Sequence, residues 1–205
     1  MKNLRMICGL ALALTAGTGM AQTTADNMSN NNNNTTVSNE MDTIVNARAF
    51  MDRFYKIKGA YKDMPDAFGK FASSGYSMDE FTKRYFAFRD SHQKQEKVAA
   101  CFAASRYDQT EFDKRYYEIK KVYPDMEKVW GDYAASKWDL KDFITRYYKI
   151  KASYPKLSPY FGEFAGSTQT MEEFAKRYYA IKDAYPKEEK YFGDYAACTE
   201  TLQGK

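Results

Sequence analysis

A phenylalanine recurs every 31 residues through most of the chain, with no insertion between any two copies. The five positions are Phe50, Phe81, Phe112, Phe143 and Phe174. Three residues after each of them stands an arginine, at Arg53, Arg84, Arg115, Arg146 and Arg177. Self-similarity at a fixed period of this length is typical of proteins that repeat one small supersecondary unit. The period predicts five tandem copies, and positions below are counted from the phenylalanine as position 0.

Each copy carries the pattern of two amphipathic helices. Positions 0, 4, 7 and 11 fall on one side of a first helix. Its start is marked by a capping residue followed three residues later by an acid; these capping residues are Ser77, Asp108, Asp139 and Thr170. A proline then ends the first helix and opens a second, at Pro124, Pro155 and Pro186. Positions 14, 17, 18, 21 and 22 give the second helix its apolar side.

Glycine recurs inside the second helix, at Gly69, Gly131, Gly162 and Gly193. Glycine in a helix interior costs about 1 kcal/mol relative to alanine. A cost that is repeated in four copies predicts that these helices pack closely against other helices.

A single helical hairpin cannot bury both of its faces, so we expect the copies to stack on their neighbours. The predicted fold is an all-α solenoid of five tandem 31-residue helix-turn-helix repeats over residues 41–198. Its layout is similar to that of tetratricopeptide-type repeats, which also place two helices and aromatic packing residues in each unit. The likeness is one of architecture, because the period is not 34 and the Trp-x-x-Leu-Gly-x-x-Tyr signature is absent.

The segments outside the repeats have different compositions. Residues 1–21 combine Lys2 and Arg5 with an apolar stretch and end in small residues, which predicts a signal peptide cleaved after Ala21. Residues 22–40 are rich in Asn, Thr and Ser and predict a flexible spacer, and residues 199–205 form a short polar tail. We therefore expect an exported protein, periplasmic or extracellular, of bacterial type.

Charge and composition exclude several classes of function. The predicted signal holds two of the 31 basic residues and none of the 27 acidic ones, which leaves 29 against 27. This balance argues against a nucleic-acid partner. No later segment is long and apolar enough to cross a membrane. No metal-ligand cluster, phosphate loop or nucleophile motif occurs, so we predict no catalytic residue, no metal and no cofactor.

Three residue types invite a functional interpretation that packing explains equally well. The recurrent arginines follow Glu80, Glu111, Asp142 and Glu173 by four residues, which favours intrahelical ion pairs over a ligand-binding ladder. His92 takes the place of a packing tyrosine. Cys101 and Cys198 lie three stacked units apart, beyond the ~7 Å between Cα atoms that a disulfide allows. We expect two free thiols, or an intermolecular bridge through Cys198.

The strongest candidate binding residues are an aromatic at position 5 and a base at position 8. Position 5 lies about 130° from the centre of the apolar stripe, so the first helix does not need an aromatic there. One explanation is a second packed face between neighbouring helices. The other is an exposed row, about 10 Å from pair to pair, that grips an extended peptide or glycan. The pairs are Tyr55 with Lys58, Phe86 with Arg89, Tyr117 with Lys120, Tyr148 with Lys151, and Tyr179 with Lys182.

These features predict an exported, non-catalytic helical-repeat scaffold that binds a protein, peptide or polysaccharide along one face. An enzyme or accessory acting on cell-envelope polymers is one alternative, but it requires convergent acids, which we do not expect the repeat to display. Self-association is the other alternative, because the ends of a solenoid expose apolar faces unless they are capped.

Overall fold

The computed structural model describes residues 46–198, and every regular element in that range is a helix. The prediction of an all-α fold is confirmed for this part of the chain. None of these helices has the length and apolarity needed to cross a bilayer. The predicted signal peptide, the spacer and the tail lie outside the described residues, as do residues 41–45 of the predicted array.

The first helix of each copy is long, and in copies two to five it is capped as predicted. These outer helices are residues 46–60, α3 (Met78–Ser91), α5 (Gln109–Val122), α7 (Leu140–Ser153) and α9 (Met171–Ala184). The side chains of Ser77, Asp108, Asp139 and Thr170 each accept a hydrogen bond from the backbone N–H three residues later. At Thr170 the Glu173 side chain completes a reciprocal capping box.

The second helix of each copy is shorter than the sequence predicts. These inner helices are α2 (Phe68–Ser73), α4 (Ala99–Ala104), α6 (Trp130–Ala135), α8 (Phe161–Gly166) and α10 (Phe192–Ala197). Four of them follow 3₁₀ turns: η1 (Gln93–Val98), η2 (Glu127–Val129), η3 (Pro155–Tyr160) and η4 (Pro186–Tyr191). Position 14 leaves helical geometry, as at Leu157 (φ −90°, ψ 20°), whose side chain is buried. The expectation of one continuous second helix was therefore wrong.

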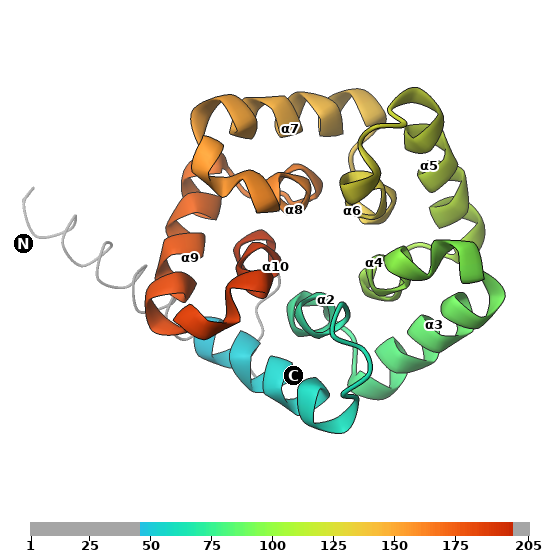
Figure 1. Ribbon diagram of the computed structural model, residues 1–205, viewed down its shortest axis with the longest axis horizontal. Helices are drawn as coiled ribbons and strands as arrows, with labels where there is room; N and C mark the ends of the chain where they lie inside the picture. The colour runs from blue at the N-terminus through green and yellow to red at the C-terminus, as the bar shows by residue number, and fades with distance from the viewer. Residues whose placement is uncertain (1–45, 199–205) are drawn as a thin grey trace, which may run out of the picture.

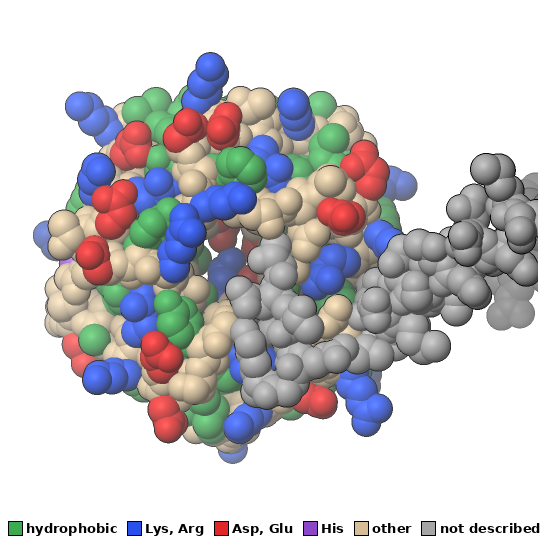
Figure 2. Space-filling view, turned by 180° about the vertical axis from the view of Figure 1, so that it is seen from behind, with side chains coloured by type: hydrophobic (Ala, Val, Ile, Leu, Met, Phe, Trp, Pro, Cys, Tyr) green, Lys and Arg blue, Asp and Glu red, His purple; other side chains and the backbone are tan. Residues whose placement is uncertain are grey.

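The five copies form a closed ring. The outer helices lie along the sides of a pentagon, and the inner helices stand inside it (Figure 1). α10 packs against α2 just as α2 packs against α4, α4 against α6 and α6 against α8. Seen from behind, the ring has a hollow at its centre (Figure 2). The copies stack on their neighbours as expected, but the array closes on itself instead of extending as an open solenoid.

The shape of one copy explains why the array curves until it closes. An outer helix has 14 residues and is about 21 Å long, and it lies along the wall. An inner helix stands beside its neighbours at a packing distance of about 10 Å. Each copy is thus wider at the wall than at the axis, and a row of such wedges bends into a circle.

The junction between copies five and one repeats the contacts of the other four junctions. The position-21 ring of each copy meets the position-0 ring of the next edge-on, with centroid distances of 5.3 Å (Phe71–Phe81), 5.4 Å (Phe102–Phe112), 5.3 Å (Tyr133–Phe143), 5.4 Å (Phe164–Phe174) and 5.5 Å (Tyr195–Phe50). The Tyr160 hydroxyl donates to the Glu189 carbonyl at 2.7 Å, and Tyr191 donates likewise to Pro65 at 3.0 Å. Closure therefore uses the repeat's ordinary interface.

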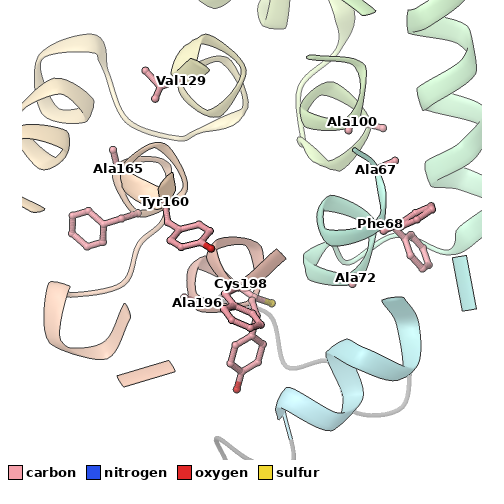
Figure 3. Packing of buried hydrophobic residues seen from close by; sticks show 14 of the residues in the cluster. Ala67, Phe68, Ala72, Ala100, Val129, Tyr160, Ala165, Ala196 and Cys198 are labelled. Carbon is pink, nitrogen blue, oxygen red and sulfur yellow. The ribbon is translucent and has the colours of Figure 1, made fainter. Parts of the chain in front are cut away.

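The recurrent glycines lie where inner helices approach each other closely, as the sequence predicted. A Cβ at Gly69 would lie 1.9 Å from Asp194 Oδ2, and one at Gly162 would lie 2.3 Å from Asp132 Oδ2. Gly193 faces the ring of Tyr160, which reaches toward α10 from the start of α8 (Figure 3). Alanines line the same inner helices in that view. Small side chains thus allow five helices to surround one axis.

The position-3 arginines hold the two helices of each copy together. Arg84 Nε donates to the Ala103 carbonyl at 3.2 Å, and Nη2 donates to the carbonyls of Phe102, Ser105 and Tyr107 at 3.1, 3.0 and 2.8 Å. Phe102 and Ala103 lie in the last turn of α4, where carbonyls lack partners within the helix, and Ser105 and Tyr107 lie just after it.

All five position-3 guanidinium groups contact position 21 of their own copy. Each donates to the position-21 carbonyl and lies 4.3–4.6 Å from the centroid of the position-21 ring; the five are Arg53, Arg84, Arg115, Arg146 and Arg177. The predicted intrahelical ion pairs are wrong, because the arginine turns toward the inner helix instead of the preceding turn. The recurrent arginine is explained by the fold of its own copy.

Candidate functional sites on the wall and axis of the ring

Four of the five predicted position-5 aromatics are exposed on the outer wall. Their exposed fractions are 48% for Tyr55, 54% for Tyr117, 50% for Tyr148 and 44% for Tyr179, whereas Phe86 is half-buried. A second packed face was one explanation for position 5. It fails for the tyrosines because the outer helices follow the sides of a pentagon and are not sandwiched between other outer helices (Figure 1).

The position-8 bases accompany these aromatics only in part. Lys58, Arg89 and Lys151 lie 5.6, 4.7 and 5.7 Å from the ring centroids of their partners Tyr55, Phe86 and Tyr148. Lys120 instead lies over Tyr116 and Trp130, and Lys182 lies over Tyr178. The predicted pairs therefore form in copies one, two and four.

The position-5 side chains of copies one, two and three contact the preceding copy. Tyr55 Oη and Lys58 Nζ both contact Glu188 Oε1 of the preceding copy, at 3.4 and 3.0 Å. At the junction between copies two and three, Gln95 Nε2 donates to Tyr117 Oη at 2.8 Å. Because the copies are arranged in a ring (Figure 1), the exposed aromatic and basic side chains of the outer helices follow its circumference.

A second cluster, which the sequence analysis missed, lies on the axis. Position 20 of each inner helix faces the centre, and its five residues are Lys70, Cys101, Asp132, Glu163 and Asp194. All five side chains line both of two cavities, of about 360 and 450 Å³. The hollow at the centre of the ring shows basic and acidic side chains together (Figure 2). The expectation that the repeat displays no convergent acids was wrong.

The charges of this axial cluster do not balance. Lys70 Nζ lies 2.9 Å from Asp132 Oδ1 and 3.0 Å from Asp194 Oδ1. Although burial alone would lower it, these carboxylates raise the pKa of Lys70 well above its usual value. Within residues 46–198, Glu163 forms no ion pair, and burial together with the charge of Asp132 raises its pKa to about 8. Burial also raises the pKa of Asp194.

The two cavities open toward opposite faces of the ring. The smaller one reaches the C-terminal caps of α4, α6 and α8, at Ser105, Ser136 and Ser167. The larger one reaches the starts of the inner helices, at Val98 and Trp130. In the described range, no three His, Cys, Asp or Glu side chains are arranged to hold a metal ion. The position-20 side chains thus form a charged collar between two polar cavities.

Among the described residues Cys101 and Cys198 form no disulfide with each other, as predicted, but the reason given for it was wrong. Copies two and five both adjoin copy one, so Cys101 and Cys198 line the same cavity and are not three units apart. Burial raises the pKa of Cys101 to about 12, which keeps its thiol protonated. Cys198 is buried and donates to the Ser73 carbonyl at 3.3 Å, a position that does not suit an intermolecular bridge.

His92 is a packing residue in this structure. Its ring stacks on Phe88 with a centroid distance of 4.5 Å, and Nε2 lies 3.0 Å from Asp113 Oδ2 of the next copy. It thus fills the slot that tyrosine holds in the other copies, as expected.

Comparisons with known proteins add no assignment. No family model, no curated protein and no solved structure matches the chain. The sequence did contain a signal for the axial cluster, since position 20 is acidic after glycine in Gly131-Asp132, Gly162-Glu163 and Gly193-Asp194. Only ring closure turns that recurrence into a shared site.

Proposed function

We propose that the protein is an exported, non-catalytic helical-repeat scaffold that binds a protein, peptide or polysaccharide on its outer wall. The observation that carries this proposal is the exposure of tyrosine at position 5 in four copies. Tyrosine offers a large apolar face and a hydroxyl with little loss of side-chain entropy, and it is enriched at binding surfaces. An exposed lysine stands three residues after each of these tyrosines, which favours a partner with acceptor or anionic groups.

The ring changes how such a partner is held. One tyrosine and one lysine bind weakly, but four copies of the ring each present an exposed tyrosine and an exposed lysine. A polymer that contacts several junctions gains from effective concentration, so its avidity exceeds the affinity of any single contact. A long glycan or peptide that follows the wall fits this arrangement better than a small molecule does.

The test is the triple variant Tyr117→Ala, Tyr148→Ala, Tyr179→Ala on peptide and glycan arrays. We expect the variant to lose the signals that the wild-type chain gives, with helical circular dichroism and Tm near wild type. Val122→Ala is the control, because Val122 is equally exposed on an outer helix, at 54%. Retained binding by the triple variant would refute the proposal, and loss of helical structure would show that the tyrosines are core residues.

An enzyme acting on cell-envelope polymers is the second candidate, and the axial acids favour it. A carboxyl group with a raised pKa beside an ionised one is the pairing that glycoside hydrolysis uses. Here, however, Lys70 engages two of the carboxylates and the collar lies inside the ring, where a polymer chain has no open cleft. Release of soluble fragments from peptidoglycan, abolished by Glu163→Gln, would establish this candidate over the first.

Self-association through the ends of the array loses its structural basis. That expectation required apolar end faces open to solvent, but α2 and α10 cover each other at the closing junction.

A further inference from the structure

The larger axial cavity combines features that a surface groove does not have. Its volume of about 450 Å³ falls within the range of small-molecule sites. Trp130, Tyr116 and Tyr191 contribute aromatic wall, and the collar of position-20 side chains forms its floor. The second copy, which departs most from the repeat, contributes the small side chain of Ala100. The cavity is therefore asymmetric, although the ring that surrounds it is nearly regular.

The floor of this cavity is acidic. It holds the carboxyl groups of Asp132, Glu163 and Asp194 against the single ammonium group of Lys70. Lys70 is shared by the two aspartates, and Glu163 forms no ion pair in the described part of the chain. A second ammonium group at the floor would pair with Glu163 and offset the excess of negative charge, and aromatic faces stabilise such a cation further.

The mouth of the same cavity is basic. Lys94, Lys97, Lys128 and Lys190 line it, with the acids Asp66 and Glu127. Two lysines are paired, because Lys190 lies 2.6 Å from Asp66 and Lys97 lies 3.4 Å from Glu127. Lys94 and Lys128 form no ion pair among residues 46–198, so they are available to an anionic group.

One residue of the cavity wall carries a buried acceptor without a partner among the described residues. Gln95 lines the cavity and is only 6% exposed. Its Nε2 donates to Tyr117 Oη, but its Oε1 has no hydrogen-bond partner in the described residues. Buried acceptors without a partner are rare because each costs about 1–3 kcal/mol.

We infer that the larger axial cavity binds a small zwitterion, with its ammonium group at Glu163 and its anionic group toward Lys94 and Lys128. A simple amine would have to pass the basic mouth, and a simple anion would meet the acidic floor. Only a ligand with both charges matches both ends. None of the exposed position-5 tyrosines lines this cavity. The zwitterion site can therefore be tested independently of the scaffold function proposed above.

Proton release gives the site a signature. Glu163 faces Lys70, Cys101, Asp132 and Asp194 from the four other inner helices, and its carboxyl group is largely protonated at pH 7. An ammonium group bound beside it favours the carboxylate. Binding at pH 7 should therefore release up to one proton, which calorimetry detects as a dependence of the heat on the buffer's ionisation enthalpy.

Isothermal titration of the full mature chain with simple probes tests the site. The zwitterions are 4-aminobutanoate and 2-aminoethyl phosphate, which distinguish a carboxylate from a phosphate as the anionic half. Butylamine and butanoate carry one charge each. We expect at least one zwitterion to bind about tenfold or more tightly than both single-charge probes. Each single-charge probe lacks one of the zwitterion's two ionic hydrogen bonds, and such a bond is worth about a factor of ten or more in affinity.

Two variants locate the ligand's two ends. Glu163→Gln should weaken zwitterion binding at least tenfold and abolish proton release, whereas Glu172→Gln on the exposed start of α9 should change neither. Lys128→Ala should weaken zwitterion binding but not that of butylamine. Binding of butylamine as tight as that of the zwitterions, binding of none of the probes at 10 mM, or an unchanged affinity in Glu163→Gln that keeps its fold would overturn the inference.

Discussion

Position 3 and position 20 of the repeat show opposite behaviour in the same ring. Position 3 is arginine five times, and each arginine donates to the position-21 carbonyl of its own copy. Position 20 is lysine, cysteine, aspartate, glutamate and aspartate, and all five side chains meet at one axis. A residue whose contacts lie within its own copy can be the same in every copy. Five identical charges at position 20, in contrast, would repel one another at a buried axis.

The largest effect should come from removing Lys70, the one base among the five position-20 residues. Lys70→Met leaves three carboxyl groups without a counter-charge, and breaking a buried ion pair from one side costs about 3–5 kcal/mol. Urea unfolding at pH 8 should show a loss of that size, and a smaller one at pH 5, where the acids can take up protons. A loss that is equal at the two pH values would mean that Lys70 contributes packing and not charge.

A smaller loss is expected at position 3. Arg115→Ala removes the donors to the Ala134 and Tyr133 carbonyls and the stacking on the Tyr133 ring. Leaving buried acceptors without a donor should lower the free energy of unfolding by about 2–3 kcal/mol, with little dependence on pH. The exposed Arg106 is the matched control, and its alanine variant should stay within about 0.5 kcal/mol of wild type. Equal effects at the two arginines would contradict the role given to position 3.

Closure of the ring predicts whether Gly69→Ala raises or lowers the free energy of unfolding, an effect smaller than that at position 3. In a closed ring, Gly69→Ala pushes a Cβ against Asp194, which Lys70 holds in place, so the variant should lose about 1–2 kcal/mol. In an open array Gly69 would lie on a free end face, and alanine would raise helix stability by about 0.5–1 kcal/mol. Thermal unfolding of the two chains side by side distinguishes a loss from a gain.

A further prediction concerns how stability changes with pH. The pKa of Glu163 is about 8 in the folded chain against an ordinary value of 4.5. Between these values the folded state binds one more proton than the unfolded state, so this group stabilises below pH 4.5 and loses its contribution as the pH rises through 8. Glu163→Gln lacks this slope, and its stability relative to wild type should rise steadily from pH 5 to 8. Parallel unfolding curves at all pH values would contradict the assignment.

The helices could be predicted from the sequence because their signals are local. Caps such as Asp108 and stop signals such as Pro155 act within a few residues, and the outer helices begin where those signals place them. The arginine contacts could not be predicted, because Arg84 reaches residues 18 to 23 positions away in the chain. An i, i+4 acid was the nearer partner in sequence, but the carbonyls of the inner helix were nearer in space.

Closure and the axial cluster escaped sequence analysis for a different reason. Whether a repeat array closes depends on the width of each copy at the wall and at the axis, which no single residue reports. Asp132 and Asp194 stand 62 positions apart, and only a ring brings both of them to Lys70. The position-5 tyrosines were identified from the sequence because an exposed aromatic breaks the local apolar pattern.

The closed ring can be tested directly by zero-length carbodiimide cross-linking of the monomer, followed by peptide mass spectrometry. Lys190 and Asp66 are exposed, lie 2.6 Å apart and belong to copies five and one. Lys97 and Glu127, 3.4 Å apart in adjacent copies, are the internal control that forms in either architecture. The ring predicts an intramolecular amide between Lys190 and Asp66 in addition to the control; the control link without the Lys190–Asp66 link would contradict closure.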